Sequence, residues 1–131
     1  MRALVSRGKG RMMLEECPEP DLKNNNVIVE VTACGICGTD LHVYKGMPAD
    51  WPIPGIRGHE FSGTILKIGD DVQGFNSGDR VVIQPLLSCG MCSLCRDGKT
   101  NLCTEMSLIG GELPGGYAEK VLVPVRSLFK L

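Results

Sequence analysis

The sequence lacks the features that mark a membrane protein or a nucleic-acid-binding protein. Its N-terminus has no continuous apolar core of the signal-peptide kind, and no later apolar run approaches the length of a membrane span. The charge is nearly balanced, with 14 basic against 15 acidic residues and a net charge of -1. Composition therefore gives nucleic-acid binding no electrostatic support. We expect no membrane partner, no nucleic-acid partner and a cytoplasmic location.

Long helical patterns are also missing. The sequence has no internal repeat, no low-complexity segment and no helical period sustained beyond a few turns. Short apolar runs are present instead, at positions 3–5, 12–14, 27–32, 61–68, 80–83 and 115–124, and the run at 27–32 is rich in β-branched residues. The pattern predicts one mainly β domain, with a short helix through residues 41–44 that Thr39 and Asp40 cap and that Gly46 and prolines 48, 52 and 54 end.

Cysteine is plentiful and unevenly placed. There are seven cysteines, and six of them lie in two tight clusters, while Cys17 stands alone. In an intracellular chain this distribution indicates metal or redox chemistry and not a disulfide framework.

The second cluster supplies four thiols within fifteen residues: Cys89, Cys92, Cys95 and Cys103. Four closely spaced thiolates are a typical ligand set for one tetrahedral zinc ion, and such a closed site is structural because no position is left for a substrate. An iron-sulfur cluster has compatible two-residue spacings, but the proline that follows the last cysteine of a ferredoxin run is missing here. Residues 86–104 have no regular period, so we expect a loop that the metal orders.

The first cluster combines several reactive groups in nine residues: Cys34, Cys37, Thr39, Asp40 and His42, with His59 and Glu60 following after a proline-rich stretch. Cys37 and His59 could supply two ligands of a zinc ion that keeps an open position. Taken alone, Cys34 and Cys37 could equally form a redox dithiol or two buried thiols, and His59 could be an ordinary histidine. The combination of thiols, imidazoles, a hydroxyl and carboxylates favours a metal-centred active site.

Five segments occur in an order that identifies a family resemblance: residues 35–42, residues 58–60, residues 78–81, the four-cysteine run and residues 116–121. In this order they resemble the N-terminal catalytic domain of zinc-dependent medium-chain alcohol dehydrogenases, most closely the polyol and threonine dehydrogenase branches. The resemblance implies a GroES-like, partly open β-barrel over residues 1–131, with short helices and a zinc-binding lobe at about residues 86–104.

The resemblance also implies roles for individual residues. Cys37 and His59 are similar to ligands of the catalytic zinc, and Glu60 to an outer ligand or an electrostatic partner. Cys34 matches no ligand position and is expected to be a structural thiol. The remaining expectations are Thr39 as the hydroxyl that takes the alcohol proton, His42 as the group that passes it towards solvent, Asp40 as the carboxylate that orients His59, and Cys89, Cys92, Cys95 and Cys103 as structural zinc ligands.

The implied chemistry is oxidation of a zinc-bound alcohol or polyol by hydride transfer to NAD(P). The Gly-x-Gly-x-x-Gly turn of a nicotinamide-binding Rossmann domain does not occur among the 17 glycines. We therefore expect that domain and the third zinc ligand to be absent from these residues, which alone should show little turnover. The complete enzyme could form a homo-oligomer.

Two alternatives remain at this point. The chain could be a free-standing zinc-binding module that uses a GroES-like barrel as a scaffold or for protein interaction. A quinone reductase shares the fold, but it would use neither cysteine cluster.

Overall fold

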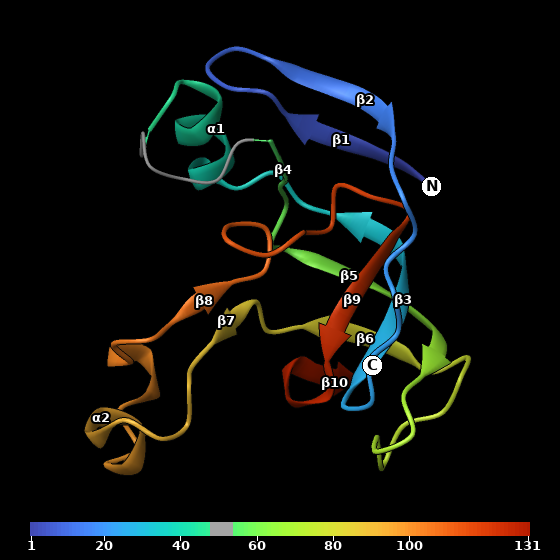
Figure 1. Cartoon of the computed structure of the whole chain (residues 1–131), viewed down its shortest axis with the longest axis vertical. Helices are drawn as coiled ribbons and strands as arrows, with labels where there is room; N and C mark the ends of the chain where they lie inside the picture. The colour runs from blue at the N-terminus through green and yellow to red at the C-terminus, as the bar shows by residue number, and fades with distance from the viewer. Residues whose placement is uncertain (48–53) are drawn as a thin grey trace.

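The computed structural model describes residues 1–47 and 54–131, so prolines 48 and 52, which we predicted to help end the helix, lie outside the described residues. The elements are β1 (Arg2–Ser6), β2 (Met12–Glu16), β3 (Asn26–Cys34), α1 (Gly38–Tyr44), β4 (Gly55–Ile56), β5 (Phe61–Ile68), β6 (Arg80–Ile83), β7 (Leu86–Leu87), α2 (Ser93–Arg96), the 3-10 turn η1 (Thr100–Leu102), β8 (Ser107–Leu108), β9 (Lys120–Pro124), the 3-10 turn η2 (Val125–Ser127) and β10 (Leu128–Lys130) (Figure 1). None of the described helices is long and apolar enough to cross a membrane. The predicted mainly β architecture is confirmed.

Two antiparallel sheets curl into a partly open barrel. The larger has the strand order β10-β6-β5-β3-β9 and the smaller the order β2-β1-β4. They meet where β1 runs beside the residues that precede β9: the Leu4 amide donates to the Tyr117 carbonyl at 2.7 Å, and the Glu119 amide donates to the Arg2 carbonyl at 3.1 Å. The sheets therefore form one curled surface around a common interior, as the predicted GroES-like barrel requires.

The interior is filled by one face of each main strand. In β5, Phe61, Gly63 and Ile65 are buried while the residues between them are partly exposed, which is the alternation expected of a strand with one face on a core. The core cluster consists of Val27, Val29, Phe61, Ile65, Val81, Ile83, Leu87, Ile109, Val121, Val123 and Leu128. Side chains that bear reactive groups are therefore found at strand ends and in connections.

Helix α1 begins earlier than predicted. Its N-cap is Cys37, not Thr39 or Asp40. Asp40 occupies the third helical position, and its Oδ2 accepts a hydrogen bond from the Cys37 amide at 2.9 Å. A carboxylate at this position can accept a hydrogen bond from an amide that would otherwise have no partner. The polar residue that marks the helix start therefore lies inside the first turn and not at the N-cap. Gly46, with φ of +89°, follows the helix as predicted.

Residues 86–104 form a separate lobe with more local structure than the expected loop. Strand β7 pairs with β8, and α2 and η1 lie between them. In Figure 1 the lobe lies at the opposite end of the long axis from α1. The prediction of an irregular loop is therefore wrong for these short elements, each too brief to leave a periodic pattern in the sequence.

Candidate metal centres

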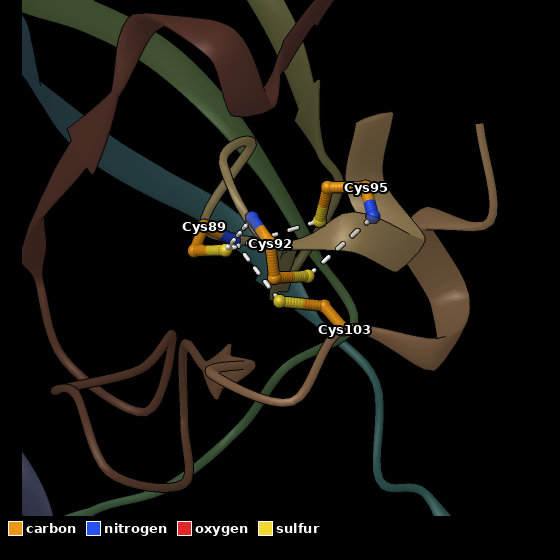
Figure 2. A group of neighbouring side chains, drawn as sticks. All are labelled: Cys89, Cys92, Cys95 and Cys103. Atoms are coloured by element: carbon orange, nitrogen blue, oxygen red, sulfur yellow. Dashed lines mark hydrogen bonds between the residues drawn. The ribbon is translucent and has the colours of Figure 1, made fainter. Parts of the chain in front are cut away.

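The four cysteines of the lobe point towards a common centre (Figure 2). Their sulfur atoms all lie within 4.8 Å of one another. Cys89 follows β7 and Cys103 precedes β8, so the pairing of these two strands brings the ends of the lobe together, while Cys92 is the N-cap of α2 and Cys95 lies within that helix. The structure thus gathers all four predicted structural ligands.

Backbone amides surround these sulfur atoms. The Cys89 amide donates to Cys103 Sγ at 3.2 Å, the Cys92 amide donates to Cys89 Sγ at 3.3 Å, and the Cys95 amide donates to Cys92 Sγ at 3.4 Å (Figure 2). The Met91 amide also donates to Cys89 Sγ, at 3.4 Å. The hydrogen bond donated by the Cys95 amide is the main cause that lowers the pKa of Cys92 to about 6. Hydrogen bonds from backbone amides also lower the pKa of Cys89. Burial, in contrast, raises the pKa of Cys95 to about 11. Since thiolates are the ligand form, this donor set fits a zinc ion.

A second group of potential ligands lies at the edge of the barrel. One ligand atom each of Cys37, His59 and Glu60 can be chosen so that all lie within 4.8 Å of one another. Cys37 follows the end of β3, whereas His59 and Glu60 lie between β4 and β5. A cleft of about 560 Å³, lined in part by Gly35, His59 and Glu60, opens beside them. Three mixed donors next to open space match the requirements of a metal site that admits a substrate.

Asp40 connects the two ligand-bearing segments. Its Oδ1 lies 3.9 Å from His59 Nδ1, while its Oδ2 accepts from the Cys37 amide. The side chains are 9% exposed for Asp40 and 12% for His59. His59 Nδ1 is buried and has no hydrogen-bond partner among the described residues. A metal-binding imidazole typically presents its second nitrogen to a carboxylate, so this arrangement fits such a role.

The other predicted site residues differ in how close they lie to the candidate ligands Cys37, His59 and Glu60. Thr39 Oγ1 is 3.8 Å from Cys37 Sγ, and Thr39 is half-buried. His42 is exposed on α1, and its side chain makes no hydrogen bond or ion pair with the described part of the chain. The thiol of Cys34 is not in the ligand group, and burial raises its pKa to about 11.

Two residues beside the site were missed by sequence reasoning. Arg57 is 1% exposed, its Nη1 donates to the Gly111 carbonyl at 2.7 Å, and burial lowers its pKa. The Tyr117 hydroxyl donates to the Gly35 carbonyl at 3.2 Å, and burial, followed by the proximity of Asp40, raises its pKa. Residues 116–121 were interpreted from the sequence as part of a strand and as one of the segments that carry the family resemblance, but no role was assigned to Tyr117.

A larger groove of about 720 Å³ lies elsewhere on the barrel. It is lined by residues of β1, β9 and the stretch after β2, including Val5, Pro18 and Leu122. None of the candidate metal ligands lines it. The candidate metal centres therefore do not coincide with the larger of these two hollows.

Comparison with known proteins identifies the family of this chain. Residues 23–131 match the family described as the alcohol dehydrogenase GroES-like domain. The chain belongs to this family. It is 35% identical over 137 aligned positions to the L-threonine 3-dehydrogenase of Yersinia enterocolitica, and the match covers all of this chain and 40% of that enzyme.

Solved structures of related enzymes superpose closely. Galactitol-1-phosphate dehydrogenase from Escherichia coli gives a TM-score of 0.94 at 33% identity, covering 100% of this chain and 38% of that one. A zinc-binding dehydrogenase from Sinorhizobium meliloti bound to NADP gives 0.92 at 35% identity, covering 99% and 38%. The chain thus spans about two fifths of the length of these relatives. The predicted family and fold are confirmed.

Proposed function

We propose that this chain is the zinc-binding catalytic domain of an NAD(P)-dependent dehydrogenase that oxidises a small alcohol or polyol. The observation that carries the proposal is the convergence of Cys37, His59 and Glu60 beside an open cleft, in a chain of this family. The lobe at about residues 86–104 would hold a second, structural zinc through its four cysteines. That ion would order the lobe and take no part in the reaction.

The barrel edge supplies the ligands and the group that orients them. Zinc held by Cys37 and His59, with Glu60 as an outer ligand or electrostatic partner, would supply Lewis-acid chemistry to a substrate hydroxyl. Asp40 acts on both ligands, because one of its oxygens faces the His59 ring and the other binds the Cys37 amide. One carboxylate thus fixes the ring orientation and the start of the helix that follows Cys37.

The proton route uses the first turn of α1. Thr39 lies beside Cys37, and its hydroxyl would take the proton of the substrate hydroxyl while it gives up its own proton towards solvent. His42 is three residues further along the helix, a spacing that places it on the same face as Thr39. Because His42 is exposed, it would release the proton to solvent.

We assign residues 1–131 to the catalytic domain and place the hydride acceptor outside them, because these residues contain no Gly-x-Gly-x-x-Gly turn. A nicotinamide-binding domain would hold NAD(P), and the third ligand of the catalytic zinc would also come from outside these residues. The reduced thiols that both zinc sites need support a cytoplasmic location.

Metal counting tests the proposal. By elemental analysis the chain should hold two zinc ions, and the Cys37→Ser, His59→Ala double variant should hold one. Cys17→Ser is the matched control because Cys17 lies in neither cluster, and it should keep both ions. A single zinc in the unmodified chain, unchanged in the double variant, would instead support a metal-ordered scaffold.

A further inference from the structure

We infer that Tyr117 is a positioning residue that holds the Cys37-bearing and His59-bearing segments at the separation a metal ion requires. The inference deepens the proposed function and rests on the metal centre proposed above. The two ligands come from connections on different strands, so their separation depends on contacts between distant parts of the chain. Tyr117 makes such contacts to both segments.

The backbone of Tyr117 is held from two sides. Its amide donates to the Arg57 carbonyl at 2.9 Å, and its carbonyl accepts from the Leu4 amide at 2.7 Å. The first bond attaches it to the segment that carries His59, and the second attaches it to β1. The position of the side chain is therefore set by the closure of the barrel.

The ring lies against the residue that precedes His59. Gly58 has φ of +88°, and a Cβ atom on it would be 2.7 Å from Tyr117 Cδ1 and 2.7 Å from Cys34 Sγ. The Gly116 amide also donates to the Gly58 carbonyl at 2.7 Å. Only glycine lets the aromatic ring approach this backbone so closely.

The hydroxyl reaches the other segment. It donates to the Gly35 carbonyl at 3.2 Å, two residues before Cys37. The Gly35 amide in turn donates to the Glu60 carbonyl at 2.7 Å. One side chain thus contacts the chain just before each of the two main ligands, with its ring at one segment and its hydroxyl at the other.

The test is Co²⁺ binding to the 131-residue chain with zinc already in the four-cysteine site. Tyr117→Phe removes the hydroxyl and keeps the ring that packs on Gly58, so the barrel should remain folded, which near-ultraviolet circular dichroism would verify. We expect Co²⁺ to bind about tenfold more weakly, at the low end of the effect of outer partners of a metal site. The cobalt absorption bands should shift as the ligand geometry loosens.

Tyr44→Phe is the matched control, since Tyr44 is the other tyrosine of the chain and is 47% exposed on α1. It should leave both affinity and spectrum unchanged. If Tyr117→Phe lowers the unfolding midpoint but binds Co²⁺ as tightly as the unmodified chain, Tyr117 is only structural and the inference is overturned. If the unmodified chain binds no Co²⁺ beyond the four-cysteine site, the proposed metal centre itself fails.

Discussion

The two cysteine-bearing regions reach a metal-ready geometry by opposite routes. In the lobe, all four thiols come from fifteen consecutive residues, and the sulfurs of Cys89, Cys92 and Cys103 accept hydrogen bonds from amides of the same segment. At the barrel edge, Cys37 and His59 come from different connections, and tertiary contacts bring them together. The lobe should therefore depend on its ion for order, whereas the barrel should exist first and then bind its ion.

The largest expected effect is loss of order in the lobe. Cys92→Ser removes the sulfur that accepts the Cys95 amide, and with it the structural zinc, whose binding in small zinc domains contributes about 10–16 kcal/mol. Amide hydrogen exchange in residues 89–103 should become fast, while β3 and β5 stay protected. Exchange measured by mass spectrometry checks this, and unchanged protection of the lobe would contradict its dependence on metal.

His59→Ala should weaken metal binding at the barrel edge and leave the fold almost unchanged. Affinity for the second ion should fall by more than about 100-fold, beyond the usual effect of outer partners. The unfolding midpoint of the metal-free chain should move little, because the His59 ring forms no hydrogen bond at Nδ1. Cobalt titration and thermal unfolding measure both quantities. His42→Ala serves as the control because His42 is exposed, and equal losses in the two variants would refute the ligand assignment.

Asp40→Asn should give a smaller change at the same site. The amide oxygen can still accept from the Cys37 amide, but the charge beside His59 Nδ1 is lost. We expect the affinity for the second metal ion to fall by about 10-fold to 100-fold. The four-cysteine site should be unaffected in the same cobalt titration. A comparable loss of metal affinity at both sites would show that the substitution acts by disturbing the whole fold.

The smallest effect concerns pH and the thiols of the metal-free chain. The folded pKa of Cys34 is raised from 9.0 to about 11, so its contribution to stability is complete below pH 9 and is lost as pH rises towards 11. The loss should be about 1 kcal/mol, because the thiol is partly exposed. Cys92, with a pKa of about 6, instead stabilises the folded chain at high pH and loses that contribution as pH falls through 6.

Urea unfolding at pH 8 and pH 10.5 measures the Cys34 contribution. The Cys34→Ala chain should show a shallower alkaline loss of stability than the unmodified chain. Parallel curves would mean that Cys34 does not resist ionisation in the folded state.

Sequence reasoning succeeded where the information is local. The spacing of Cys89, Cys92, Cys95 and Cys103 predicted a cluster because few residues separate them, and β-branched alternation predicted the main strands, including β3 and β5. The family resemblance predicted that Cys37, His59 and Glu60 would meet. Their roles as ligands remain predictions.

What sequence reasoning could not supply depends on distant contacts. The contact of Tyr117 with Gly35 joins residues 82 positions apart, and no local pattern records such a distance. The burial of Arg57 runs against the usual exposure of charged residues. The true start of α1 was missed because Asp40 bonds backwards to Cys37, so its preference for helix starts was assigned to the wrong position.

The pairing of β7 with β8 has a consequence for how this domain can vary. Leu87 lies opposite Ser107, so the chain leaves the barrel and returns to it at the same place. The lobe is therefore an insertion whose two ends lie side by side. Residues can be added or removed within it while β6 and β9 keep their register with their neighbours in the larger sheet. A designed turn joining Leu87 to Ser107 would yield a smaller barrel that retains Cys37, His59 and Glu60 and carries a single metal.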